Sequence, residues 1–375
     1  MSALAAPTVD LLDEAMRQAR RGGRWQAQGF QRHRSTRKSG RMCGKALGEY
    51  VVVDVATASA HVSGIFRCSS PWSCPTCSPT IARRRAVEIS TAVAVAIAKG
   101  YRVVMVTGTL SHHHGDNLTS LLDLLAHGWE AFTRNRTRYG IAGFIRSVEI
   151  TYGQHGWHPH VHALVFIAPG VDVDEVCARR GQAWRDAIAR HGGFSDPVHG
   201  WNVRHVEDDG KVVSDYVAKV EGIDSWTVGD ELARDDLKSR GGVKPFELLQ
   251  RAVAGDPAAA RLWAVYESST ASRVRIQWSH GLRALLEVEE ISDEEAAAVE
   301  SDEEMIAHAV VDRQTWHGLL NGGRVGHLLD AVENLVRWGE RWPPGLPSCI
   351  VRPGASRGSQ RSGTLDAPSR AGGVL

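Results

Sequence analysis

Hydrophobic and polar positions follow two different periods between residues 100 and 220. Runs of β-branched and apolar residues predict strands at Arg102–Leu110, Phe144–Tyr152, Val161–Ile167 and Trp201–Val206. Apolar residues at helical spacing predict helices at 118–138, 173–191 and 211–220. The predicted order is β-α-β-β-α-β-α. Its first six elements form a split βαβ, ferredoxin-like α+β unit, in which helices cover one face of an antiparallel sheet and leave the other face free.

The pattern outside this region is simpler. Residues 1–40 are rich in arginine and poor in apolar residues after Met16, which predicts a flexible basic arm. Beyond residue 223 the spacing is helical, with Pro245 opening one helix and Asp256 capping another. Residues 305–342 add one or two helices. From Pro343 onward, the Gly, Pro, Ser and Arg content predicts a disordered tail.

Two histidines on the third predicted strand suggest a metal site. His160 and His162 are two positions apart, so their side chains lie on the same face of the strand. If residues 153–156 form the turn before this strand, Glu149 on the preceding strand lies directly opposite His160. Two imidazoles and a carboxylate predict a divalent metal site. The alternative is a strand that carries histidines near a solvated edge.

A cysteine cluster predicts a second, structural metal site. Cys74 and Cys77 form a Cys-x-x-Cys pair, and Cys68 supplies a third thiolate. Cys43 is the best fourth ligand, with His61 as the other candidate. Four protein ligands fit a structural Zn²⁺ ion. A disulfide or a redox pair is less favoured, because no secretion signal or thioredoxin-like unit surrounds the motif.

Charge is distributed unevenly along the chain, although the net charge is only +1. Residues 1–102 hold 16 Lys and Arg against 6 Asp and Glu, whereas residues 287–304 contain ten carboxylates and no Lys or Arg. This asymmetry is typical of a nucleic-acid binder. Arg83, Arg84 and Arg85 follow the cysteine motif and are candidate DNA contacts. We find no signal peptide or membrane span and expect a cytoplasmic protein.

The sequence Gly156-Trp-His-Pro-His-Val-His162 resembles the HUH endonuclease signature in the form found in actinobacterial and Gram-positive rolling-circle plasmid replication initiators of the single-tyrosine group. Val106–Leu110 is similar to the first motif of that family, and Tyr216-Val-Ala-Lys219 is similar to the third. The resemblance extends over about residues 40 to 285. It includes the cysteine cluster and the segments Lys244–Leu249 and Gln277–Arg283.

The resemblance implies a site-specific single-strand DNA endonuclease. Tyr216 would be the nucleophile, and Lys219, one turn away on the same helix face, would assist it. Glu149, His160 and His162 would hold Mg²⁺ or Mn²⁺. The protein would nick one strand of a double-strand plasmid origin and leave a 5′-phosphotyrosine and a free 3′-hydroxyl. No GxxxxGK[ST] motif is present, so a host helicase and polymerase are the expected partners.

We therefore expect five segments. They are a basic flexible arm (1–40), a zinc-knuckle segment (41–100), an HUH endonuclease core (101–222), an α-rich extension (223–342) and a disordered tail (343–375).

Several points stay open at this stage. Some relatives carry a carboxylate where this chain has Val212; Asp215, Glu207, Asp208 or a second protomer's tyrosine are the alternatives for ending the cycle. His112–His114 are either ligands or part of a solvated loop. Other functions compatible with the motifs are an HUH transposase or relaxase, a zinc-knuckle DNA-binding regulator without catalysis, and a non-haem iron oxygenase.

Overall fold

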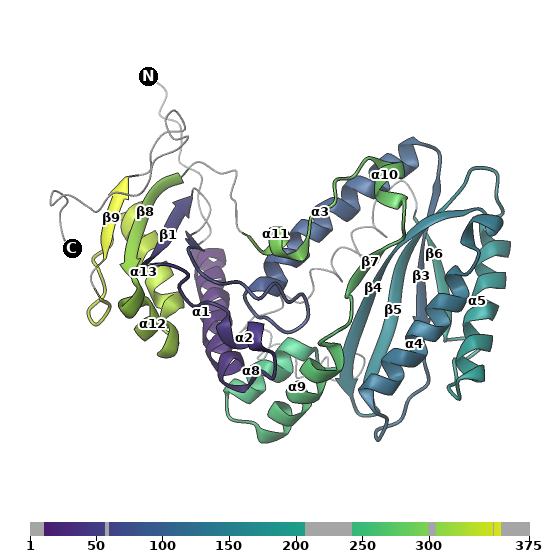
Figure 1. The fold of residues 1–375 in the computed structure, drawn as a ribbon, viewed down its shortest axis with the longest axis horizontal. Helices are drawn as coiled ribbons and strands as arrows, with labels where there is room; N and C mark the ends of the chain where they lie inside the picture. The colour runs from purple at the N-terminus through teal and green to yellow at the C-terminus, as the bar shows by residue number, and fades with distance from the viewer. Residues whose placement is uncertain (1–10, 57–59, 207–241, 299–304, 348, 354–375) are drawn as a thin grey trace.

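The structure is a computed structural model that describes residues 11–56, 60–206, 242–298, 305–347 and 349–353. It confirms the α+β class and shows two lobes, each built on an antiparallel sheet (Figure 1). Tyr216, Lys219 and the candidate residues Glu207, Asp208, Val212 and Asp215 lie outside the described residues. No helix among the described residues is both long enough and apolar enough to cross a membrane.

The larger lobe contains a five-stranded sheet with the order β6-β3-β5-β4-β7. Its strands are β3 (Arg102–Thr109), β4 (Ile141–Gly153), β5 (Gly156–Ile167), β6 (Trp201–His205) and β7 (Ile276–Trp278). The first four are the predicted strands. The short edge strand β7 was not predicted. All neighbouring strands are antiparallel. Of these pairs, only β4 and β5 are consecutive in the chain and joined by a tight turn.

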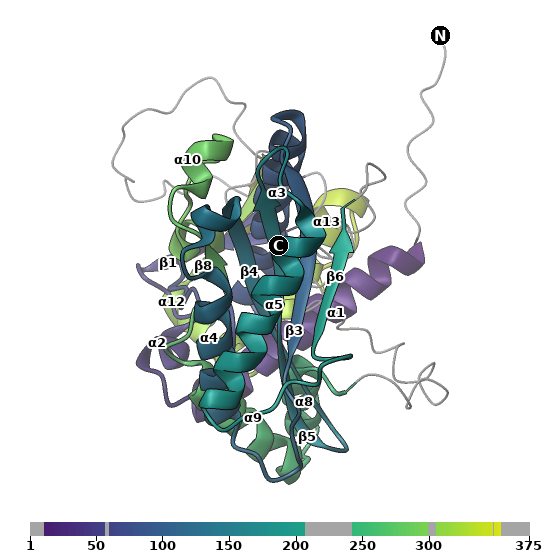
Figure 2. The same ribbon diagram turned by 90° about the vertical axis from the view of Figure 1, so that its right-hand side faces the viewer.

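Both faces of this sheet carry helices, but they are covered to different extents. Helices α4 (Leu118–Thr133) and α5 (Val173–Arg190) pack side by side on one face (Figure 2). Helices α3 (Cys77–Ala98) and α10 (Leu282–Leu286) pack on the other face against Met105, Leu164 and Phe166. The expectation of one free face is therefore corrected, since α3 and α10 cover one end of that face.

The smaller lobe was not foreseen from the sequence. Its sheet has the order β2-β1-β8-β9, formed by β1 (Tyr50–Ala56), β2 (Ala60–Ser63), β8 (Met305–Asp312) and β9 (Ile350–Pro353). Helices α12 (Arg313–Asn321) and α13 (Val325–Trp338) share its hydrophobic core. The region beyond residue 223 thus contains strands as well as helices. The predicted disordered tail is corrected for 350–353, and Cys349 is buried in this core rather than lying in a tail.

Helix α1 (Leu11–Arg34) corrects the prediction of a flexible arm for residues 11–34. In its first half, Arg17 and Arg21 pair with Glu333 on α13, whose carboxylate is fully buried. In its second half, Gln31 donates a hydrogen bond to Glu267 of the other lobe. Helix α1 therefore links the two lobes.

Helices α2 (Lys38–Met42), α8 (Pro245–Val253), α9 (Pro257–Thr270) and α11 (Asp293–Ala297) lie near α1 and between the lobes (Figure 1). The 3₁₀ helix η1 (Arg136–Tyr139) leads into β4 in the larger lobe. The predicted Asp256 N-cap is confirmed, because its carboxylate accepts hydrogen bonds from the Ala258 and Ala259 amides. Helix α11 belongs to the acidic stretch 287–304 and packs against α3, where Asp293 pairs with Arg85.

Candidate metal centre and its surroundings

The β4–β5 hairpin has the register predicted from the sequence. Tyr152 lies opposite Trp157, and Glu149 lies opposite His160. Both residues of such a pair point to the same face of the sheet. The alternation of side chains then places His162 on that face as well. Two adjacent central strands therefore hold the three candidate ligands on a rigid support.

Glu149, His160 and His162 converge on a single point. Glu149 Oε2 lies 3.0 Å from Nε2 of His160 and 3.0 Å from Nε2 of His162. His162 is 3 % exposed, and its Nδ1 lies 3.0 Å from Thr107 Oγ1 on β3. This second contact fixes the direction of the imidazole ring, as the outer partners of ligating histidines commonly do. Thr107 is a supporting residue that the sequence reasoning missed.

The electrostatics of this triad suit a cation. Burial would raise the pKa of Glu149, but hydrogen bonds from His160 and His162 outweigh burial and lower its pKa below the usual range. The carboxylate is therefore ionised at neutral pH. His160 Nδ1 is buried and has no hydrogen-bond partner among the described residues. The three ligand atoms lie within 4.8 Å of one another, and the observed 3.0 Å separations equal the edge expected for octahedral bonds of about 2.1 Å.

The position of the triad on the sheet leaves it accessible to solvent. Leu164 and Phe166 continue the same face of β5 and are buried beneath α3. His160 and His162 lie farther toward the hairpin turn, beyond the core that α3 and α10 form with the sheet. Part of the Glu149 side chain, 30 %, remains accessible. The triad thus occupies the uncovered end of an otherwise covered face.

Further histidines extend from the triad toward the turn. The His158 ring lies 5.1 Å from the His160 ring and stacks on His112 at 4.8 Å, between ring centroids. Burial, followed by the proximity of His160 and His112, lowers the pKa of His158 to about 4. The open question about the His112–His114 loop is thus partly answered. His112 stacks on His158, the ring next to the triad, and His112 itself is not one of the three candidate ligands.

The four candidate zinc ligands also meet. The Sγ atoms of Cys43, Cys68, Cys74 and Cys77 lie within 4.8 Å of one another. Cys43 Sγ is 3.6 Å from Cys74 Sγ and 3.7 Å from Cys77 Sγ. Zn–S bonds of about 2.3 Å in a tetrahedron place the sulfurs about 3.8 Å apart, so the arrangement fits Zn²⁺.

The pKa values of the clustered cysteine thiols support the same interpretation. Hydrogen bonds from Cys43, Cys68 and Cys74 lower the pKa of Cys77, whereas burial raises the pKa of Cys74. A buried thiolate among thiols needs a cation to offset its charge. The other candidate ligand, His61, lies on β2 opposite Asp54 and is not part of this cluster.

The arginines after the cysteine motif have different surroundings. Arg83 is exposed, whereas Arg85 is 7 % exposed and forms ion pairs with Glu88 and Asp293. Arg85 therefore holds α3 to α11, and its guanidinium already has anionic partners. Of the three predicted DNA contacts, Arg83 presents the most accessible side chain.

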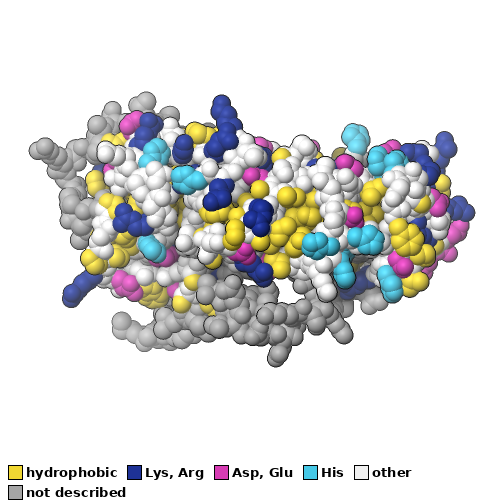
Figure 3. Space-filling model, turned by 90° about the horizontal axis from the view of Figure 1, so that it is seen from below, with side chains coloured by type: hydrophobic (Ala, Val, Ile, Leu, Met, Phe, Trp, Pro, Cys, Tyr) yellow, Lys and Arg dark blue, Asp and Glu magenta, His cyan; other side chains and the backbone are white. Residues whose placement is uncertain are grey.

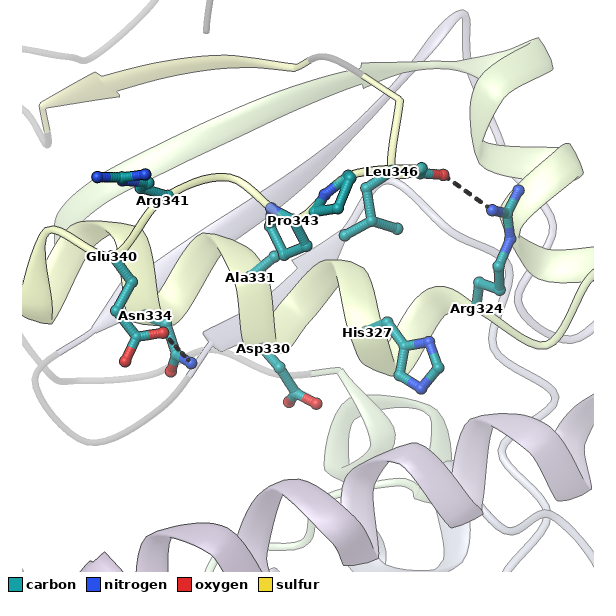
Figure 4. A pocket seen from close by; sticks show the side chains of 11 residues that line it. Arg324, His327, Asp330, Ala331, Asn334, Glu340, Arg341, Pro343 and Leu346 are labelled. Carbon is teal, nitrogen blue, oxygen red and sulfur yellow. Dashed lines mark hydrogen bonds between the residues drawn. The ribbon is translucent and has the colours of Figure 1, made fainter.

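A pocket of about 400 Å³ lies away from both clusters (Figure 4). It is formed in the smaller lobe by α13 and the segment that follows it, including His327, Asp330 and Arg341. Acidic and basic side chains both line it, and none of the seven candidate metal ligands does. It is a surface feature separate from the candidate sites.

Comparison with known proteins relates the chain to replication proteins. A family model described as "Replication protein" matches residues 61–173. A Streptomyces lividans protein named "Protein rep" is 30% identical in an alignment covering 78% of this chain and 82% of that protein. A Streptomyces cyanogenus protein named "Neomycin resistance protein" is 29% identical over 30% of this chain and 33% of that protein. No solved structure matches the chain.

Proposed function

The chain belongs to the replication protein family, and from this premise we propose that it initiates rolling-circle replication of a plasmid by nicking one strand of the double-strand origin. The observation that carries the proposal is the convergence of Glu149, His160 and His162 on two central strands. The strand order β6-β3-β5-β4 supports it, because this is the order of a split βαβ, ferredoxin-like HUH core.

In the proposed reaction, the Tyr216 hydroxyl oxygen attacks the phosphorus of one phosphodiester. A bond forms between Tyr216 and the phosphate, and the bond to the 3′ oxygen breaks, which leaves a free 3′-hydroxyl and a 5′-phosphotyrosine. Lys219 would offset negative charge on the phosphate or lower the pKa of Tyr216. Mg²⁺ or Mn²⁺ held by Glu149, His160 and His162 would supply Lewis-acid polarisation of the phosphate oxygens. The proposed reaction uses one tyrosine nucleophile, as the resemblance to the single-tyrosine group of initiators implies.

The described residues that flank Tyr216 in the sequence support its assignment. Before the undescribed segment 207–241, the Val206 amide bonds the Val103 carbonyl at one end of the sheet. After it, Val243 pairs with Tyr152 near the opposite end, beside the hairpin turn. Val206 and Val243 therefore lie on either side of the level of the triad.

A structural Zn²⁺ ion is the second cofactor that we propose. Cys43 follows α2, whereas Cys77 begins α3, so one ion would tie the chain beyond α1 to the larger lobe. This arrangement favours a structural role, since four thiolates leave no open position for substrate.

DNA binding would use the basic residues near the end of α1 and in α2. Residues 15–48 contain ten Lys and Arg and no Asp or Glu. Within this stretch Arg34, Lys38 and Arg41 are exposed. The underside of the molecule shows Lys and Arg side chains over the smaller lobe, the middle and the far end of the larger lobe (Figure 3). His side chains lie over both lobes, with a group of them over the larger lobe. Origin duplex bound along this side would bring an adjacent strand to the triad, with host helicase and polymerase acting afterwards in the cytoplasm.

A non-catalytic DNA-binding regulator is the second candidate, and the cysteine cluster is the observation that favours it. The two candidates differ in one measurable product. With labelled single-stranded origin DNA and Mn²⁺, a nicking enzyme forms a covalent adduct that survives denaturation, whereas a regulator forms none. The adduct should contain only the DNA 3′ of the nick, attached through its 5′-phosphate to a peptide containing Tyr216.

Variants make this experiment specific. Tyr216→Phe removes the hydroxyl while keeping the ring and should abolish the adduct. Lys219→Ala should slow its formation without changing the modified residue. Tyr152→Phe, on β4, is the matched control and should form the adduct normally. An adduct of normal yield with Tyr216→Phe would overturn the assignment of the nucleophile.

A further inference from the structure

Four imidazole rings form a continuous row that runs from the hairpin turn into the triad. From the hairpin turn inward they are His112, His158, His160 and His162, with successive ring centroids 4.8, 5.1 and 4.6 Å apart. His160 and His162 belong to the metal centre. The proposed reaction gives no role to His158 and His112, although both rings are partly accessible to solvent.

The outer pair is held in place by the hairpin turn. His112 Nδ1 lies 3.0 Å from the His155 carbonyl oxygen. Gly156 has φ +87°, and a Cβ atom there would lie 3.0 Å from His114 Cα. The loop that carries His112 therefore packs closely on the turn, and a side chain at residue 156 would push it away. Within the loop, the His113 amide bonds Asp116 Oδ2 at 2.6 Å. These contacts make the His112 ring a fixed surface.

We propose that the stacked pair His112–His158 binds an unpaired nucleobase next to the scissile phosphate. This inference rests on the proposed nicking function and adds to it a site that selects or orients one nucleotide. A phosphate held at the triad lies beside His158, because the His158 and His160 rings are neighbours. The base of an adjacent nucleotide then meets the flat rings of the outer pair, and flat aromatic side chains bind unpaired bases by stacking.

The geometry favours a nucleobase over a second metal ion. The His112 and His158 rings are 26° from parallel, so their nitrogen lone pairs, which lie in the ring planes, do not converge. Neither residue belongs to a described group of three or more possible ligands. By contrast, the His160 and His162 rings are 87° apart, and both Nε2 atoms approach the same carboxylate oxygen. Ring orientation thus separates a ligating pair from a stacking pair.

The test measures binding of single-stranded DNA that spans the mapped nick. Each nucleotide beside the nick is replaced in turn by an abasic residue, and affinity is measured by fluorescence anisotropy with Mg²⁺ in a Tyr216→Phe background. Loss of the stacked base should weaken binding by about tenfold at one position. In His158→Ala, an abasic residue at that position should cause no further loss of affinity. In His158→Phe, which keeps a flat ring without nitrogen, the abasic penalty should persist.

His155→Ala is the matched control, because the hydrogen bond between His155 and His112 uses the His155 backbone carbonyl, and it should keep the full penalty. An unchanged penalty in His158→Ala would overturn the proposal. Equal loss in His158→Phe and His158→Ala would overturn it as well, since the imidazole nitrogen would then be required.

Titration with Mn²⁺ followed by electron paramagnetic resonance should give the same number of bound ions in the parent and in His158→Phe. A lower number in the variant would identify His158 as a metal ligand instead. Failure of the unsubstituted enzyme to nick this DNA would count against the proposed function and not against this site.

Discussion

Glu149 and His160 lie directly opposite each other on β4 and β5, and Glu149 Oε2 is 3.0 Å from His160 Nε2. The same oxygen is 3.0 Å from His162 Nε2. A single carboxylate oxygen thus contacts both imidazoles, and the chain has brought two donors and one anion to one point before any cation binds. Removing any member should remove the cation site.

Glu149→Ala, His160→Ala and His162→Ala should therefore each abolish cleavage of single-stranded origin DNA. Duplex binding should stay nearly intact, because it depends on phosphate contacts elsewhere. A cleavage assay beside a mobility-shift assay separates the two effects. His158→Ala, next to the triad but outside it, should retain cleavage at saturating DNA, because the proposed base contact changes DNA affinity and not the metal site. If His158→Ala proves as severe as His160→Ala, the assignment of ligands is wrong.

Purified protein should contain one tightly held Zn²⁺ ion per chain, measured by elemental analysis. The four sulfurs already have near-tetrahedral spacing, so mild chelation should stop nicking, by removing Mg²⁺ or Mn²⁺, before it removes Zn²⁺. Cys74→Ser should lose zinc and lower solubility or origin binding. Cys177→Ser is a matched control, since Cys177 is buried in α5 away from the cluster. Protein without zinc would refute the structural site.

Local rules were sufficient to predict the hairpin and the clustering of the candidate metal ligands. Strand alternation has a period of two, and the four-residue turn 153–156 fixes the register, so Glu149 can be placed opposite His160 without any distant contact. The Cys74-x-x-Cys77 spacing is local in the same way. Cys43, more distant in the sequence, was placed only by the usual number of zinc ligands.

The smaller lobe depends on contacts that no local pattern contains. Strand β1 pairs with β8, with Tyr50 opposite Asp312, and neither short strand indicates its partner in the sequence. Helix α1 looked like a solvated arm because, after Met16, its arginines outnumber its apolar residues. The partners of Arg21, Asp330 and Glu333, are more than 300 positions away, although Arg17 also pairs with nearby Glu14. Sequence-distant ion pairs of this kind can be recognised only once the fold is known.

The ion pairs around Glu333 predict an acid-sensitive smaller lobe. Burial would raise the pKa of Glu333, but its contacts with Arg17 and Arg21 outweigh burial and lower its pKa. A lowered folded-state pKa gives stability that is present above the unfolded-state value of about 4.3 and is lost as pH falls through the lower folded-state value. Burial raises the pKa of the neighbouring Asp330, which partly offsets this trend.

Glu333→Gln should therefore destabilise the protein at pH 7 by about 3 kcal/mol, because it removes the buried carboxylate that Arg17 and Arg21 share. It should also flatten the fall in melting temperature between about pH 5 and pH 3. Thermal melts followed by circular dichroism across this range measure both effects. Glu340→Gln, at an exposed carboxylate that accepts a hydrogen bond from Asn334, is the control and should melt like the parent. A pH profile unchanged by Glu333→Gln would mean that another group causes the acid transition.

The exposed cations of α2 should dominate the salt dependence of duplex binding. Lys38 and Arg41 lie in a stretch of 34 residues, 15–48, that contains no carboxylate, so no nearby acidic side chain within it competes with a DNA phosphate. Each phosphate contact that is lost should reduce the slope of log K against log salt by about 0.9. Lys38→Ala and Arg41→Ala should each show this change in anisotropy titrations with origin duplex. Arg190→Ala, at an exposed position on α5 on the far side of the larger lobe, should leave the slope unchanged (Figure 1). Equal slopes for all three variants would place the duplex on another surface, with exposed Arg83 as the next residue to test.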